Sequence, residues 1–148
     1  MPQIESEYIK TGKIKLVFLD FPLESIHKKA FKASEAAHCA GDQGKYWEMH
    51  DLLFKTQNAL DMKDFVKHAE TLGLDLPAFN ECLEKEKHAG RIRATMKDAL
   101  AAGVGSVPVF LLGFPESEGK VKAVKMIKGA QPFASFKGTI DELLKTQK

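Results

Sequence analysis

The chain has no long hydrophobic run, no excess of one charge and only two cysteines among its 148 residues. Its longest apolar stretches, such as residues 107–114, fall far short of the roughly 18 residues that cross a bilayer. Its 22 basic and 20 acidic residues are mixed along the sequence, without the basic stripe that nucleic-acid binding usually needs. We therefore expect no nucleic-acid partner and no membrane span.

Signals that divide or export a chain are also missing. No internal repeat, low-complexity tract or linker rich in Pro, Gly or Ser interrupts the sequence, and 148 residues suit one average domain. Residues 1–7 are acidic and polar, where a secretory signal has a basic and then an apolar stretch. We expect one domain over residues 1–148 and no export signal in this chain.

Familiar catalytic and metal-binding motifs are absent as well. The sequence contains no Gly-rich phosphate loop and no Ser-His-Asp signature. Four histidines lack the spacing of metal ligands, and we expect them at the surface or at helix caps: His27, His38, His68 and His88. His50 adjoins Asp51, but neighbours on a helix point about 100° apart, so we expect the two not to converge. The sequence therefore predicts no metal and no cofactor.

What the sequence does contain is a series of strand and helix patterns. Residues 14–19 form a nearly unbroken apolar run, which is typical of a strand covered on both faces. The two late strands should form an antiparallel hairpin with its turn over residues 115–120. The expected elements, in order, are a short helix at 3–10 that ends at Gly12, a strand at 14–19, five helices within 25–102, strands at 108–112 and 123–127, and a helix at 133–144.

Apolar spacing also predicts which side chains are buried. The first long helix, at residues 25–40, should bury a stripe that starts at Ile26, and the last of the five, at 85–102, a stripe that ends at Leu100. Asp61 and Asp75 are expected to begin the third and fourth helices. The larger aromatic side chains are expected in the core, namely Phe18, Phe21, Tyr46, Trp47, Phe54 and Phe110.

Three segments, in this order, resemble the DsbA-like branch of the thioredoxin superfamily. Residues 13–23 look like its second thioredoxin strand with the Phe-Pro-Leu that follows. Residues 36–54, AAHCAGDQGKYWEMHDLLF, are similar to its helical insertion, and residues 103–110, GVGSVPVF, resemble its cis-proline loop. The likeness spans essentially residues 3–145. It implies an α/β, thioredoxin-like fold with a helical insertion at residues 25–102 and the rest of the thioredoxin motif at residues 13–24 and 103–148.

One departure from that family decides the functional expectation. The family places a strand ending in Cys-x-x-Cys before the strand that resembles residues 14–19, and this sequence has no Cys-x-x-Cys. The chemistry needs a cysteine of lowered pKa at a helix N-terminus and a second one to resolve the mixed disulfide. We therefore expect a truncated fold, missing the first strand and the redox-active turn, and a chain inactive as a thiol:disulfide oxidoreductase. The alternatives are a peptide-binding module without redox chemistry and a self-associating structural protein.

The missing strand also predicts a partner. In thioredoxin-like sheets it lies between the strands that resemble residues 14–19 and 109–112, so a central slot is left empty. Unpaired buried backbone groups cost on the order of 1 to 3 kcal/mol each. We expect a second copy to fill or close the gap, giving a homodimer.

The resemblance assigns roles to five residues. Ser106, Val107 and Pro108 would form the cis-proline loop, where the Val107 backbone can pair with extended or unfolded polypeptide. The interpretation that the sequence favours for this loop is a turn kept for folding. Cys39 and Cys82 fall where family members often carry cysteines, which favours a structural disulfide over two buried thiols. Family members are usually periplasmic or extracytoplasmic, but the sequence leaves the compartment of this chain open.

Overall fold

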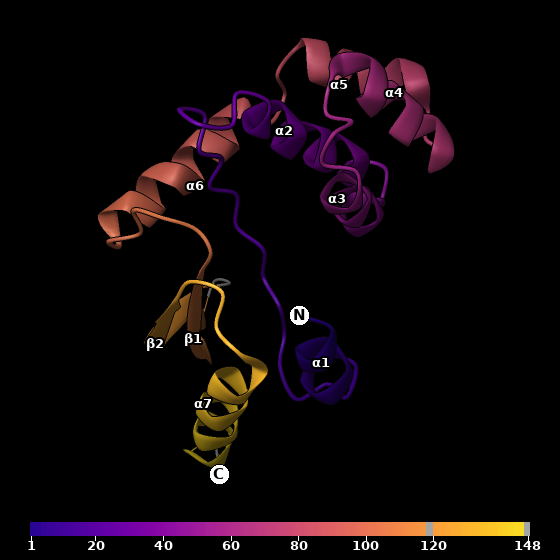
Figure 1. The fold of residues 1–148 in the computed structure, drawn as a ribbon. Helices are drawn as coiled ribbons and strands as arrows, with labels where there is room; N and C mark the ends of the chain where they lie inside the picture. The colour runs from indigo at the N-terminus through magenta and orange to yellow at the C-terminus, as the bar shows by residue number, and fades with distance from the viewer. Residues whose placement is uncertain (118–119, 147–148) are drawn as a thin grey trace. The chain divides into compact units, whose positions relative to one another are not determined.

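The polypeptide forms two units in a computed structural model that describes residues 1–117 and 120–146 (Figure 1). One unit is Leu19–Ala102, and the other combines Met1–Phe18 with Gly103–Lys148. The turn expected over residues 115–120 lies partly outside the described residues. Over the residues that are described, no helix has the length and apolar character of a membrane span.

The Leu19–Ala102 unit contains five consecutive helices, as predicted, and α2 to α5 lie together in Figure 1. Their bounds are α2 (Ala30–Gly41), α3 (Tyr46–Lys55), α4 (Met62–Thr71), α5 (Leu76–Glu84) and α6 (Ala89–Ala101). Small residues on α2 let its neighbours approach closely. The core that α2 to α5 share includes Ala36, Ala37, Cys39, Ala40, Met49, Leu53, Phe65, Ala69, Phe79, Cys82 and Leu83. The helix α6 packs through Ala89 and Ile92 against Phe31 of α2.

Two of these helices begin where side-chain caps were predicted. At α4, the Asp61 side chain accepts a hydrogen bond from the third helical residue, and Asp64 Oδ2 accepts one from Asp61 N at 3.1 Å, which completes a capping box. At α5, Asp75 Oδ1 accepts a hydrogen bond from Ala78 N at 2.8 Å. Each cap satisfies a backbone N–H that the first helical turn leaves without a partner.

Several predicted helix faces were wrong. The helix α2 begins at Ala30, because turns occupy the residues before it, and Ile26 is 68% exposed. The helix α3 buries Met49 and Leu53, one turn apart, and this leaves Trp47 and Phe54 exposed rather than in the core. Phe18 of the predicted aromatic core and Leu100 at the end of α6 are also exposed.

The second unit packs the two ends of the chain against a hairpin. Its elements are α1 (Pro2–Ile4), the π-helix η1 (Glu5–Ile9), β1 (Val109–Pro115), β2 (Val121–Lys128) and α7 (Phe133–Thr146). Gly12 has a φ of 72° just after η1, where the left-handed conformation favours glycine. The buried centre consists of Ile4, Tyr8, Phe136 and Ile140, with Phe110 of β1 edge-on to Phe136 at 4.8 Å between ring centroids.

The predicted antiparallel hairpin is confirmed, but the predicted strand at residues 14–19 is wrong. Strands β1 and β2 pair from Val109 with Lys128 to Pro115 with Val121, with a register shift at Leu112 and Gly113. The sheet of the described residues has two strands, and residues 14–20 belong to neither a helix nor a strand. A strand forms only where its backbone pairs with a neighbouring one, and in the sheet of the described residues β1 and β2 pair with each other rather than with this segment.

Candidate functional site

A disulfide joins Cys39 of α2 to Cys82 of α5, with the two Cα atoms 5.9 Å apart. Both cysteines lie on the inner faces of their helices, and their exposed fractions are 1% and 7%. They are the only cysteines of the sequence. The bond therefore uses every thiol that the 148 residues contain, and it closes a loop of 43 positions.

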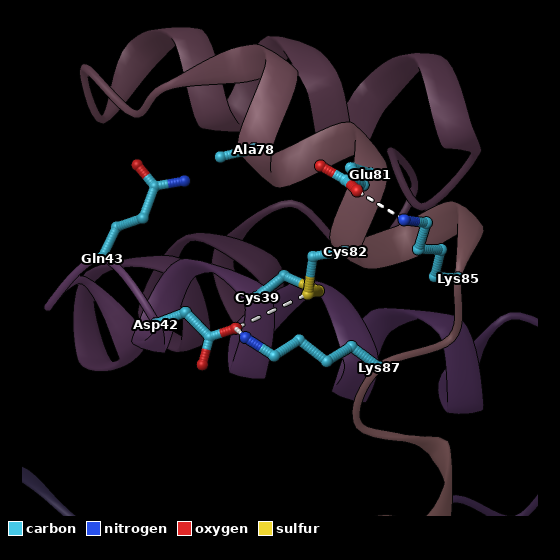
Figure 2. Close-up of a pocket in the computed structure, with 8 residues that line it drawn as sticks. All are labelled: Cys39, Asp42, Gln43, Ala78, Glu81, Cys82, Lys85 and Lys87. Carbon is cyan, nitrogen blue, oxygen red and sulfur yellow. Dashed lines mark hydrogen bonds and ion pairs between the residues drawn. A yellow bond between two sulfur atoms is a disulfide. The ribbon is translucent and has the colours of Figure 1, made fainter.

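The disulfide lies at an open pocket with charged walls (Figure 2). Asp42, just after α2, faces Lys87, whose Nζ donates a hydrogen bond to Asp42 Oδ2 at 2.9 Å. The same carboxylate oxygen lies 3.7 Å from Cys82 Sγ. Burial raises the pKa of the Asp42 carboxyl, but the hydrogen bonds from Lys87 and His88 outweigh it and hold this pKa below its ordinary value. The carboxylate next to the disulfide is therefore held in its ionised form.

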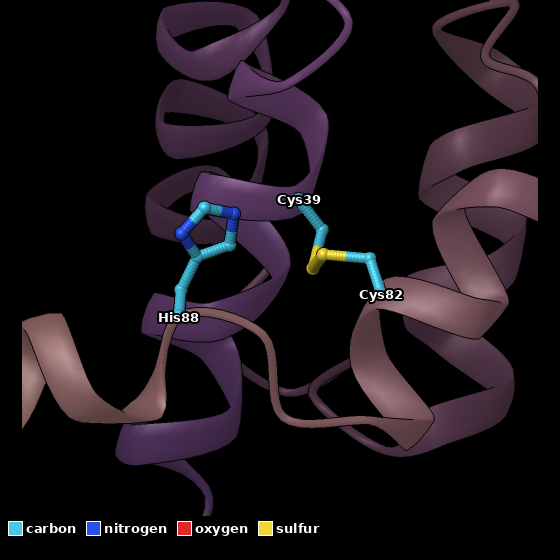
Figure 3. Close-up of side chains that lie close together, drawn as sticks. All are labelled: Cys39, Cys82 and His88. Carbon is cyan, nitrogen blue, oxygen red and sulfur yellow. A yellow bond between two sulfur atoms is a disulfide. The ribbon is translucent and has the colours of Figure 1, made fainter.

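His88 lies beside the disulfide, in the turn between α5 and α6 (Figure 3). Its Nε2 is 2.9 Å from Asp42 Oδ2, and one of its ring nitrogens lies within 4.8 Å of the sulfur atoms of both Cys39 and Cys82. No sequence pattern indicated this cluster, because its members come from three separate segments rather than from one regularly spaced motif. Only the pairing of α2 with α5 brings them together.

A buried carboxylate contacts a histidine one residue along α2 from the disulfide. Asp20 Oδ2 is 2.8 Å from His38 Nε2, and Asp20 is 8% exposed. Burial raises the pKa of the Asp20 carboxyl, yet the hydrogen bonds from His38 and Ser34 together with the nearby histidines outweigh it and lower this pKa. The histidines were predicted to lie at the surface or at helix caps. This is wrong for His68, which is buried with its Nε2 3.0 Å from the carbonyl oxygen of Ala59, while His38 is partly buried against Asp20.

His50 and Asp51 do touch, contrary to the sequence prediction. His50 Nδ1 lies 2.9 Å from Asp51 Oδ1, because the side-chain torsions of adjacent residues can bring their tips together where their Cβ directions diverge. Asp51 is exposed, with 79% of its side chain accessible. The ring centroids of Trp47 and Phe54 lie 5.1 and 4.7 Å from the ring centroid of His50. This arrangement is an aromatic surface of α3 with one exposed carboxylate.

Ser106, Val107 and Pro108 form an exposed loop that leads directly into β1. The Val107–Pro108 peptide bond is cis. Pro108 O accepts a hydrogen bond from Gly129 N at 2.9 Å, which fastens the loop to the residue after β2. Val107 itself is 48% exposed. The loop belongs to the hairpin unit, and the two cysteines belong to the helical unit.

Residues 1–142 match the protein family described as Thioredoxin. The chain belongs to the thioredoxin family. Among solved structures, the crystal structure of Wolbachia pipientis alpha-DsbA1 matches 98% of this chain and 75% of its own, with a TM-score of 0.81 and 25% sequence identity. The chain is therefore a DsbA-like member of the thioredoxin superfamily with a thioredoxin-like fold.

Curated relatives of this thioredoxin-family chain include two kinds of protein. The probable disulfide bond formation protein D of Bacillus anthracis is 25% identical over 101 residues, which are 66% of this chain and 46% of that protein. The Na(+)/H(+) antiporter NhaA 3 of Salinispora tropica is 36% identical over 111 residues, which are 75% of this chain and 17% of the antiporter. The chain thus spans less than half the length of these relatives.

Proposed function

We propose that this DsbA-like chain comes from the thiol:disulfide oxidoreductase lineage but does not itself catalyse disulfide exchange as these 148 residues. The observation that carries the proposal is the Cys39–Cys82 bond, which uses both cysteines of the sequence. Exchange requires a thiolate that reaches a substrate disulfide and a second cysteine to resolve the product. Cys39 and Cys82 are both buried and belong to different helices, so neither fits the role of an exposed attacking thiolate.

An insulin-reduction assay with dithiothreitol tests this proposal. We expect the protein to precipitate insulin no faster than dithiothreitol alone. A matched variant, Cys39→Ala with Cys82→Ala, should give the same rate as the wild type. Turnover above the uncatalysed rate would contradict the proposal, and its loss in the double variant would assign the activity to this pair.

A second candidate function is binding of extended or unfolded polypeptide at the Ser106–Pro108 loop. It is favoured by the exposure of this loop immediately before β1, where an incoming strand could pair with the Val107 backbone. Backbone pairing of this kind holds many sequences, because its hydrogen bonds do not depend on side chains. Binding through backbone hydrogen bonds therefore suits a protein that binds unfolded chains.

Fluorescence anisotropy with a labelled, reduced and alkylated unfolded protein tests this second function. We expect Val107→Ala to keep the affinity, because it retains the backbone N–H, and Val107→Pro to abolish binding, because it removes that donor. Equal binding by both variants, with circular dichroism spectra like that of the wild type, would exclude pairing at Val107.

We further propose a second copy of the chain as the partner of residues 14–19. This segment lies outside the sheet of the described residues, and it exposes Leu16, Val17 and Leu19 by 39%, 67% and 62%. Apolar side chains on a segment of strand-forming composition favour pairing with another strand. Two such segments related by a twofold axis would cover one another.

A further inference from the structure

The surroundings of the disulfide resemble a set of metal ligands. The two sulfur atoms and one His88 nitrogen all lie within 4.8 Å of one another. A fourth donor stands beside them, since Asp42 Oδ2 is 2.9 Å from His88 Nε2 and 3.7 Å from Cys82 Sγ. Figures 2 and 3 show these side chains converging from the end of α2, from α5 and from the turn before α6.

These separations are close to those of a tetrahedral zinc site. Zn–S bonds of about 2.3 Å and Zn–N or Zn–O bonds of about 2.0 Å place neighbouring ligand atoms roughly 3.3 to 3.8 Å apart. The distances from Asp42 to His88 and Cys82 fall within a few tenths of an ångström of this range. Reduction would let the two bonded sulfur atoms separate, and the His88 nitrogen, which lies within 4.8 Å of both, would close on the ion.

We propose that reduction of the Cys39–Cys82 disulfide creates a zinc site whose ligands are Cys39, Cys82, His88 and Asp42. The oxidised chain holds a disulfide at this place, and the reduced chain holds one zinc ion instead. The helices α2 and α5 therefore stay cross-linked in both states. This inference concerns a site outside the Ser106–Pro108 loop, and it does not rest on the proposed function.

The exchange between the two states balances as follows. A dithiol reductant gives two electrons and two protons to the Cys39–Cys82 bond, which becomes two thiols, while the reductant closes its own disulfide. Zn²⁺ then binds both sulfurs and displaces the two thiol protons to solvent. Oxidation by a disulfide reverses both steps and releases the ion.

Charge and ligand type favour zinc over a hard cation. Two thiolates and an imidazole are ligands that suit Zn²⁺, whereas Mg²⁺ and Ca²⁺ prefer oxygen. Two thiolates and one carboxylate would leave the occupied site with a net charge of about −1. The ammonium of Lys87, 2.9 Å from Asp42 Oδ2, offsets that charge.

The test uses the 148-residue protein, oxidised or reduced with a phosphine that does not compete for metal as a thiolate. Native mass spectrometry after addition of Zn²⁺ should show one ion per reduced chain and none per oxidised chain. Co²⁺ in place of Zn²⁺ should give the thiolate-to-cobalt charge-transfer absorption. His88→Ala and Asp42→Asn should each weaken the competition-measured affinity by about tenfold or more, and Cys39→Ser with Cys82→Ser should abolish binding.

The matched control is His27→Ala, which alters an exposed histidine outside the cluster and should leave the affinity unchanged. Circular dichroism of each oxidised single variant establishes that it folds before reduction. A reduced wild type that takes up no zinc would overturn the proposal, whether or not it stays folded. Binding that His88→Ala and Asp42→Asn both leave intact would also overturn it, because two thiolates alone would then hold the ion.

Discussion

At the scale of single residues, the cross-link between α2 and α5 should dominate stability. In the chain-entropy account, a bond that closes a loop of 43 positions stabilises the folded state by about 4 kcal/mol. We expect Cys39→Ala with Cys82→Ala to lower the free energy of unfolding by about that amount in urea titrations with a chelator present. Reduction should lower the stability of the wild type but not that of the variant. A double variant as stable as the oxidised wild type would contradict this account.

The buried pair of Asp20 and His38 makes a pH-dependent contribution. The Asp20 pKa is lowered in the folded chain, so its stabilisation is present above the unfolded pKa and is lost as the pH falls through the folded value. The groups that lower the pKa of Asp20 include His38, Ser34 and His50. The charge of Asp20 in turn raises the pKa of Tyr46. Acid should therefore weaken the wild type in the range below about pH 4, near the unfolded pKa of an aspartate.

Asp20→Asn tests this contribution. We expect it to cost about 1.5 to 3 kcal/mol at pH 7, the usual value of a hydrogen bond to a charged group, and to flatten the acid side of the stability profile. Urea titrations from pH 7 to pH 2 measure both effects. Asp98→Asn, at an exposed position of α6, is the control and should follow the wild type. An acid profile of Asp20→Asn that overlays the wild type would refute the assignment.

At the scale of elements, the hairpin depends on Gly113. This residue lies at the register shift between β1 and β2, and a Cβ there would meet the backbone of Lys122 and Ala123. We expect Gly113→Ala to destabilise the protein by about 1 to 3 kcal/mol, the range typical of overpacking. The comparison is Gly138→Ala in α7. A Cβ there meets nothing within 4 Å, and alanine has a higher helix propensity than glycine, so this change should stabilise the protein by up to about 1 kcal/mol. Thermal unfolding should show shifts of opposite sign, and shifts of the same sign would contradict this reading.

Local signals explain which elements the sequence predicts. Caps such as Asp61 and Asp75 mark helices within a few residues of their observed starts, and alternating side chains mark the β1–β2 hairpin. The prediction of a strand at residues 14–19 fails because a strand depends on pairing with a neighbouring strand, which the residues of the segment do not encode. The prediction that Trp47 lies in the core fails because the packing of α3 against α2 decides which face of α3 is buried, and that face carries Met49.

The site was predictable only in part, for the same reason. Likeness to a family suggested that Cys39 and Cys82 pair, and it marked the loop before β1. Neither likeness nor spacing pointed to His88 or Asp42, because three segments have to fold together before these side chains meet Cys82. Clusters of this kind follow from tertiary packing rather than from a motif.

At the scale of the whole molecule, self-association is the expectation that residues 14–19 support. Light scattering after size exclusion should give the mass of a dimer at micromolar concentration. Val17→Lys should shift the protein to a monomer, because Val17 is 67% exposed and its change leaves the core intact. Leu100→Lys, at another exposed apolar position, should leave the dimer unchanged. A wild-type monomer at this concentration would rule out the proposed partner.

The cross-link also gives the chain a covalent ring. The segment between Cys39 and Cys82 carries all of α3 and α4, and both of its ends are tied to the same bond. A protease that cuts once inside this ring releases no fragment, so the nicked protein keeps its mass apart from one added water. On an electrophoresis gel it would run as one band without reductant and as two bands with it.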